Sequence, residues 1–287
     1  MTGVAIIGAG RLGTSLGRAL AEKGHSVLWI ADKHPAAARE GRRIIGRGRA
    51  TSDIAKTAEA EIIFLCVPDG EIERAAGSLA KTAAAWREKV ILQTSGILSS
   101  ASLAALRARG ASCASFHPVQ SFPRKGMPAA RFRNIVIALD GDEAALRAAK
   151  RLSRSLGARP FLLGARDKAA FHAACSMASN LFVPLFEMAR TLLRGIGIGD
   201  AEAAKILVPL GEGTLRSVRI LDGASALTGP ISRGDIATVE KHLRALRNHP
   251  NALRAYRVLG KEAVRLAGKK DLPPRTIKAL KRLMAGK

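Results

Sequence analysis

Three glycines close to the N-terminus provide the clearest chemical signal in the sequence. The run Gly8–Gly13 has the form G-x-G-x-x-G, follows the apolar segment Val4–Ile7 and opens a helical pattern, Arg11–Lys23. In this setting the first glycine permits a tight turn, the second lets a diphosphate approach the backbone, and the third lets the helix pack against the strand. The phosphates would lie on free N–H groups at the helix start, where the helix dipole favours anions. The pattern predicts a dinucleotide site; the alternative is a βαβ unit that has lost its ligand.

An acidic residue, Asp32, ends the next apolar segment and lies 19 residues after Gly13. A carboxylate at this position can accept hydrogen bonds from the ribose hydroxyls of NAD. The cations that follow it could instead bind the 2′-phosphate of NADP, and their number slightly favours NADP; they are Lys33, Arg39, Arg42 and Arg43. The predicted cofactor-binding residues are Gly8, Gly10, Arg11, Leu12, Gly13, Asp32, Lys33, Val67 and Pro68.

Turn and hydroxyl residues follow two further apolar segments that have the pattern of buried strands. In open α/β sheets, ligands bind at the carboxyl ends of the strands. Val67 and Pro68 would therefore wall the cofactor, and Thr94 and Ser95 would present hydroxyls to the nicotinamide or the substrate. The alternative is that both segments are ordinary loops.

Two sets of titratable residues could move a proton. His117, followed by a proline, comes directly after a predicted strand and would project into the same cleft. Its ordinary pKa near neutrality suits proton transfer to or from a carbonyl. Lys168 and His172 belong to a polar stripe on a long apolar helix, which continues through Ser176 and Ser179 with Asn180 at its margin. Residues three and four apart share a helix face, so this stripe would face a wet cleft or find polar partners between domains.

A loop rich in glycine and proline, Thr228–Asp235, contains one further candidate. Arg233 could hold a substrate carboxylate or phosphate through two parallel hydrogen bonds, and Asp235 could cap the following helix. The alternative is a loop that only caps the helix. The predicted catalytic residues are therefore His117, Lys168 and His172, and the predicted substrate-binding residues are Thr94, Ser95, Asn180 and Arg233.

Alternating strand and helix patterns position these residues. Apolar strands are predicted at 4–7, 26–31, 61–67, 89–93 and 111–116, with a β–α–β stretch over 134–163, a basic surface segment over 33–49 and a helix over 99–109. This alternation predicts an α/β Rossmann-like, doubly wound parallel sheet over residues 1–164. From 165 to 287 the pattern is helical, which predicts an all-α domain whose first helix, Asp167–Leu193, is buried and central.

Composition limits the class of protein. The chain has 287 residues and a net charge of +24, from 47 Lys and Arg against 23 Asp and Glu. No aromatic residues interleave with the basic ones as a nucleic-acid stacking platform needs, so we expect a basic surface and no specific nucleic-acid partner. We expect no membrane-spanning helix and no signal peptide. Three cysteines in apolar contexts, Cys66, Cys113 and Cys175, predict reduced core thiols without a metal site, in a cytoplasmic protein.

Several motifs in order along the chain resemble those of a group of predicted oxidoreductases. That group joins a Rossmann-like domain to a helical C-terminal domain of unknown function, and is similar to β-hydroxyacid dehydrogenases, pyrroline-5-carboxylate reductase and prephenate dehydrogenase. The resemblance implies a helical domain that closes over the nicotinamide and often dimerises. It also matches Lys168 to the catalytic lysine of β-hydroxyacid dehydrogenases, with His172 in place of their asparagine, and His117 to a catalytic histidine of prephenate dehydrogenases. The motifs are Gly8–Gly13, Val67–Asp69, Thr94–Gly96, His117–Phe122, Ala178–Asn180 and Ala226–Asp235.

Together these features predict an NAD(P)-dependent oxidoreductase, most simply a homodimer joined through its helical domain. Hydride would pass between the nicotinamide and a small, anionic carbonyl/alcohol or imine/amine substrate held between the domains. The alternative is a regulatory protein that binds the dinucleotide without turnover.

Overall fold

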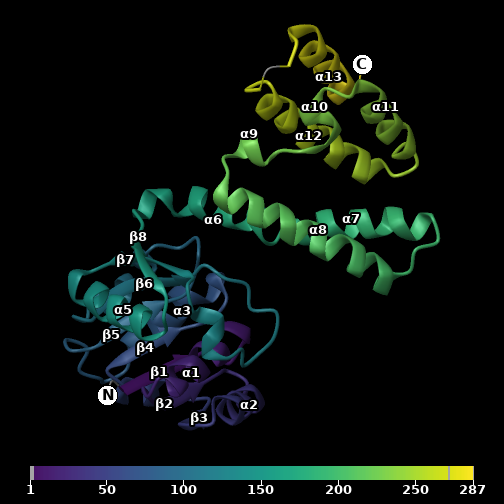
Figure 1. Ribbon diagram of the computed structural model, residues 1–287. Helices are drawn as coiled ribbons and strands as arrows, with labels where there is room; N and C mark the ends of the chain where they lie inside the picture. The colour runs from purple at the N-terminus through teal and green to yellow at the C-terminus, as the bar shows by residue number, and fades with distance from the viewer. Residues whose placement is uncertain (1–2, 271, 287) are drawn as a thin grey trace. The chain divides into compact units, whose positions relative to one another are not determined.

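The computed structural model describes residues 3–270 and 272–286 (Figure 1). The chain forms two compact units, the first ending at Ser176 and the second beginning at Met177. The first unit thus extends beyond residue 164, the boundary expected from the sequence. The reason is that Lys168, at the start of the next helix, is bound to two strands of the sheet.

An eight-stranded sheet forms the centre of the first unit, in the order β3-β2-β1-β4-β5-β6-β7-β8. Its neighbouring strands are parallel except for β6 and β7, which are antiparallel. The predicted Rossmann-like sheet is confirmed, and the antiparallel pair is a feature that the sequence analysis did not predict. The strands are β1 (Gly3–Ile7), β2 (Ser26–Ala31), β3 (Arg49–Thr51), β4 (Ile62–Leu65), β5 (Val90–Gln93), β6 (Ser112–Pro118), β7 (Val136–Gly141) and β8 (Arg159–Leu162).

Helices cover both faces of this sheet, because side chains along each buried strand alternate between two cores. In β1, Val4 and Ile6 join the core under α1 (Arg11–Glu22), α2 (Pro35–Ile45) and α5 (Glu143–Ser155). Ala5 and Ile7 join the opposite core, under α3 (Asp69–Ala80) and α4 (Ala104–Arg107). Short 3-10 helices complete the unit at η1 (Ile54–Glu59), η2 (Ser100–Leu103), η3 (Ala129–Phe132) and η4 (Ala165–Asp167).

Three local expectations differ from the structure. The basic segment 33–49 contains α2 and the start of β3 rather than irregular surface chain. The helix expected at 99–109 is a 3-10 turn followed by one α-helical turn. Strand β6 continues through His117 and Pro118, because pairing with β7 extends it, so His117 lies within the strand and not after it.

The second unit is helical, and its buried core contains Val239, Val264, Leu280 and Met284. The single buried helix expected at 167–193 is wrong. The chain instead forms α6 (Lys168–Ala178) and α7 (Phe182–Gly195), broken by a turn, and large apolar side chains of α7 are exposed. The remaining helices are α8 (Asp200–Ile220), α9 (Gly223–Ala226), α10 (Gly229–Arg233), α11 (Ile236–Ala245), α12 (Pro250–Ala267) and α13 (Pro274–Ala285).

The stretch Ala165–Gly195 has the length and apolar composition that a membrane span requires, which the sequence analysis did not expect. Of its most apolar 18-residue window, 0% is buried within the protein. The stretch is interrupted by the turn between α6 and α7, and its early residue Lys168 is buried against the sheet. The structure thus divides this stretch between α6, whose first residue is bound to the sheet, and α7.

Candidate active site

The glycine loop between β1 and α1 has the geometry that a diphosphate requires. Gly8 has a φ of 102°, and a Cβ there would overlap the carbonyl oxygen of Cys66. A Cβ at Gly13 would overlap the carbonyl oxygen of Gly8, so this glycine allows the helix to pack on the loop. A Cβ at Gly10 would meet nothing within 4 Å. Gly10 therefore faces open space. No neighbouring atom of the protein would clash with a side chain there, but an approaching ligand would.

Backbone N–H groups at the start of α1 remain available to that ligand. The first N–H groups of any helix lack a partner within the helix and carry the positive end of its dipole. No acidic side chain lies in the first turn of α1, and Gly10, at the N-cap, provides no side-chain cap. Arg11, Leu12 and Gly13 thus present their N–H groups to an anion, and these residues fit a dinucleotide diphosphate.

A cavity of about 300 Å³ adjoins this loop. Asp32 lies in its wall, where its Oδ2 accepts a hydrogen bond from the N–H of Ala9 and its Oδ1 one from the N–H of His34, both at 2.9 Å. The carboxylate is therefore held in place by the glycine loop itself. Predicted cofactor residues that line the cavity are Gly8, Gly10, Asp32, Lys33, Val67 and Pro68.

Several residues that the sequence did not predict for the site also line this cavity, among them Arg74 and Cys66. Arg74 reaches it from α3, where it also pairs with Glu71, whereas Arg39, Arg42 and Arg43 are not among its lining residues. Cys66 also lines it, and burial raises the pKa of its thiol to about 12, so the thiol stays protonated. Neither residue had a sequence signal, because their position depends on how β4 and α3 pack beside β1.

Thr94 and Ser95 are buried at the end of β5, and their hydroxyls are already engaged. The hydroxyl of Thr94 donates to the carbonyl oxygen of Leu65 at 3.2 Å. The Ser95 hydroxyl accepts from the N–H groups of Ile97 and Leu98. These bonds show that both side chains shape the turn after β5, while contact with a substrate stays a prediction.

Two imidazoles meet above the glycine of this turn. His117, from β6, and His172, from α6, have ring centroids 5.6 Å apart and ring planes inclined at 65° in an edge-to-face arrangement. Their Nδ1 atoms are buried and have no hydrogen-bond partner among the described residues. A Cβ on Gly96 would overlap Nδ1 of His172 and lie 2.9 Å from Cε1 of His117. Gly96, the last residue of the motif Thr94–Gly96, therefore makes room for the pair.

The environment of His117 keeps its imidazole neutral. Burial lowers its pKa to about 4, with smaller contributions from the neighbouring His172 and Lys168. Burial disfavours the charged imidazolium, and nearby positive charges act in the same direction. At neutral pH the imidazole of His117 is therefore uncharged and can accept a proton as a base.

Lys168, predicted to be catalytic, is instead enclosed. Its ammonium is 1% exposed and donates to Oγ of Ser115 at 2.6 Å and to Oδ1 of Asp140 at 3.0 Å. Asp140 was missed by the sequence analysis, although an aspartate that ends an apolar strand is a signal that could have identified it.

The other two predicted substrate residues belong to the second unit. Asn180 lies in the exposed turn between α6 and α7, and Arg233 is exposed at the end of α10. The segment around Arg233 forms a short helix, and Asp235 caps α11 by accepting from the N–H of Thr238. Their contact with a substrate stays a prediction.

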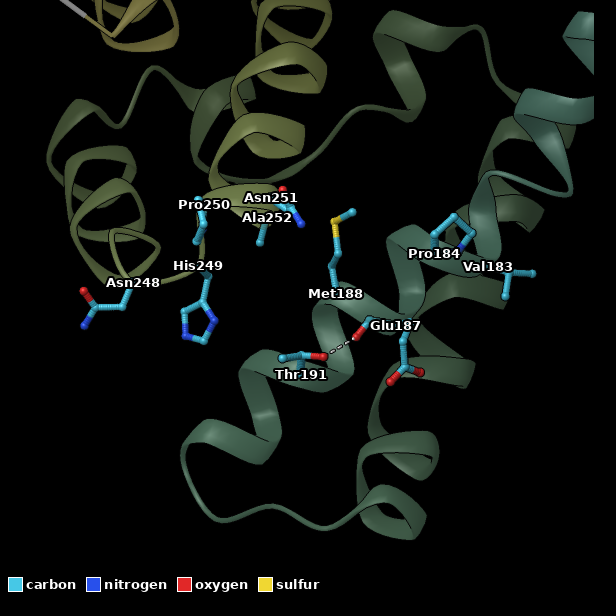
Figure 2. A pocket seen from close by; sticks show the side chains of 10 residues that line it. All are labelled: Val183, Pro184, Glu187, Met188, Thr191, Asn248, His249, Pro250, Asn251 and Ala252. Atoms are coloured by element: carbon cyan, nitrogen blue, oxygen red, sulfur yellow. Dashed lines mark hydrogen bonds between the residues drawn. The ribbon is translucent and has the colours of Figure 1, made fainter.

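A larger cavity, of about 570 Å³, lies in the second unit between α7 and the start of α12 (Figure 2). Figure 2 shows Met188 and Val183 on α7 and His249 and Asn251 near the start of α12, with a hydrogen bond from Thr191 to the carbonyl of Glu187. None of the residues predicted for the site lines it. Within residues 3–270 and 272–286, no group of three or more His, Cys, Asp or Glu residues could hold a metal ion.

Family models match both parts of the chain. A Rossmann-like domain matches residues 2–118, and a domain of unknown function, DUF2520, matches residues 135–263. None of the curated proteins that were compared matches.

Solved structures share this two-part fold. A proposed NADP oxidoreductase of Bacteroides fragilis is 22% identical, with a TM-score of 0.76 over 91% of this chain and 97% of its own. A protein of Thermotoga maritima is 24% identical, with a TM-score of 0.71 over 94% and 100%. The pyrroline carboxylate reductase of Plasmodium falciparum, solved with NADP bound, is 12% identical, with a TM-score of 0.62 over 97% and 99%.

Proposed function

We propose that this chain, which joins a Rossmann-like domain to a DUF2520 domain, is an NAD(P)-dependent oxidoreductase in which His117 and His172 move the proton. Its substrate would be a small, anionic carbonyl/alcohol or imine/amine. The observation that carries the proposal is the imidazole pair with unbonded Nδ1 atoms. The pair lies in the same unit as the glycine loop, and β1, β4, β5 and β6 are adjacent parallel strands whose carboxyl ends share one edge.

The residues divide the work between binding and proton transfer. A bound nicotinamide would supply or accept the hydride. The N–H groups of the glycine loop would hold the diphosphate, and Val67 and Pro68 would bound the cofactor cavity. As hydride leaves an alcohol or amine, the neutral imidazole of His117 would accept the substrate's proton. In the reverse direction the imidazolium, formed by taking up a proton from water, would give that proton to the oxygen or nitrogen of the substrate. The imidazole of His172 would hold that of His117 in position and would help to carry the proton that His117 accepts or gives.

We also propose that NADP is preferred over NAD. Lys33 and Arg74 bring two cations to the wall of the cofactor cavity, and the carboxylate of Glu71, which pairs with Arg74, lies in the same wall. Both oxygens of Asp32, the residue that would select NAD, accept hydrogen bonds from the backbone. A 2′-phosphate would gain from the two cations. Asn180 and Arg233 are proposed to contact the anionic end of the substrate.

Titration calorimetry and a turnover screen test this function. We expect NADP(H) to bind with saturation and more tightly than NAD(H), and reduced coenzyme to be oxidised by at least one small carbonyl or imine. Replacing His117 with Asn or His172 with Gln should lower turnover by about a hundredfold or more, because general acid–base catalysis contributes factors of that size. Coenzyme affinity should not change in either variant.

The control is His249→Gln, a histidine of the second unit outside the predicted site, which should leave turnover unchanged. Binding without turnover on any carbonyl or imine would favour a dinucleotide-sensing protein. The absence of binding at millimolar coenzyme would reject both functions.

We propose that a second copy of the chain covers the exposed apolar residues of α7 and α8. Exposed apolar patches larger than those of ordinary monomers mark interaction surfaces. Light scattering should give twice the chain mass of 30.3 kDa, and a charge introduced by Leu210→Glu should halve it. A monomeric mass for the unchanged protein would reject the dimer. The exposed apolar residues are Leu181, Phe182, Val183, Leu185, Ile206, Val208, Leu210, Leu215, Val218 and Ile220.

A further inference from the structure

We infer that Lys168 is a positioning residue that holds the His117–His172 pair together, with Asp140 and Ser115 as its partners. The inference concerns how the two imidazoles are arranged, and that part of it applies whether or not the protein turns over a substrate. Only its consequence for catalysis rests on the proposed function.

Two contacts connect α6 to β6, and they are matched in spacing. Ser115 and His117 lie two residues apart on β6, so their side chains share one face of the strand. Lys168 and His172 lie four residues apart on α6, so they share one face of the helix. Lys168 binds Ser115, and His172 packs against His117. The contact between Lys168 and Ser115 therefore determines where the imidazole of His172 lies.

The ammonium of Lys168 joins three parts of the first unit. Ser115 and Asp140 face each other across the antiparallel pair β6 and β7, and Lys168 donates to both. The other oxygen of Asp140 accepts a hydrogen bond from the N–H of Ser100 at 2.8 Å. The turn after β5 is thus connected to the same carboxylate. A buried charge is tolerated only where its partners are well placed, so the start of α6 has little freedom to shift.

Burial also argues against Lys168 as the proton donor. A general acid must come within hydrogen-bond reach of the reacting atom. The ammonium is 1% exposed, the Asp140 side chain is 10% exposed, and two of the three ammonium hydrogens already have protein acceptors. His117 and His172 are only partly buried as residues, and His172 lies one helical turn further along α6 than Lys168.

The test replaces the ion pair with uncharged residues, in the double variant Lys168→Met/Asp140→Asn. Removing Lys168 alone would leave a buried carboxylate without its partner and could unfold the protein. The asparagine side chain retains an oxygen for the N–H of Ser100, and methionine fills a similar space to lysine. Ser115→Ala is a milder second variant that removes one acceptor. The control is Lys205→Met, which breaks an exposed pair with Glu202 in the second unit.

We expect the double variant to fold and to bind coenzyme normally, because the glycine loop is formed by β1 and α1. Proton NMR should show loss of the cross-peak between the rings of His117 and His172. The pKa of His117 should rise above about 4, because burial is the largest cause of its low value but the neighbouring His172 and the Lys168 ammonium lower it further, and the variant removes the ammonium. Turnover should fall on the order of a hundredfold, the cost of misplacing a reacting group. Ser115→Ala should change each quantity in the same direction by less.

Two results would overturn the inference. Turnover abolished with ring cross-peak and His117 titration unchanged would make Lys168 the proton donor. If the ring cross-peak, the titration of His117 and the turnover are all unchanged, Lys168 has no positioning role. If the unmodified protein shows no turnover, the proposed function fails, but the ring cross-peak and the titration still decide whether Lys168 positions the pair.

Discussion

Replacing Gly96 with alanine is expected to abolish turnover while leaving coenzyme affinity unchanged. The backbone of Gly96 does not have the positive φ that would exclude a side chain, so the added methyl group acts through space alone. It would overlap Nδ1 of His172 and press on the ring of His117. The two imidazoles must then separate, and the loss of their proton transfer should cost a factor of about a hundred to ten thousand in turnover.

Steady-state rates and coenzyme titrations of Gly96→Ala measure this effect. Gly77→Ala is a matched control, because a Cβ at this helical glycine of α3 meets nothing within 4 Å. The control should keep full turnover and gain slightly in thermal stability, since alanine favours a helix. Full turnover in Gly96→Ala would show that the imidazole pair does not perform the chemistry.

The second large effect concerns Gly10. An alanine at this position would fold normally, because its φ of −76° suits any residue and its Cβ faces open space. The same methyl group would stand where the diphosphate must approach the N–H groups of α1. Charge-assisted hydrogen bonds contribute about 1.5–3 kcal/mol each, so the loss of two should weaken coenzyme binding by about a hundredfold or more.

Calorimetry and thermal melts of Gly10→Ala separate binding from folding. We expect a raised coenzyme Kd and an unchanged Tm. Gly13→Ala provides the contrast, because its Cβ would overlap the carbonyl oxygen of Gly8 and should destabilise the protein itself. Normal coenzyme affinity in Gly10→Ala would place the diphosphate elsewhere.

Local patterns predicted the first half of the fold well. The strand at Ser26–Ala31 and the helix beginning at Arg11 were predicted at their observed positions, because hydrophobic periodicity and the glycine turn are local properties. Strand β3 was missed, because its three residues are too few to show a period. The antiparallel pairing of β6 with β7 was also missed, since strand direction depends on where the long loop between them returns the chain.

The two histidines proposed to move the proton, and the lysine beside them, also show which properties are local and which depend on tertiary contacts. Spacing along α6 predicted that Lys168 and His172 share a face, and His117 was expected near the end of a strand. Their different roles could not be predicted, because Lys168 is explained by Asp140, 28 residues earlier on another strand. An identical lysine with no carboxylate opposite it would be free to reach a substrate.

By itself, the sequence determined the Rossmann-like architecture and its glycine loop, and it pointed to the two histidines and the lysine that the structure brings together. These features follow from local properties of the chain, namely the steric requirements of the glycine turn and the hydrophobic periodicity of helices and strands. Only the tertiary structure decided that the two imidazoles meet over Gly96 and that the lysine beside them is enclosed in an ion pair. Those facts depend on contacts between residues distant in the chain, which burial and charge pairing select after the elements have formed.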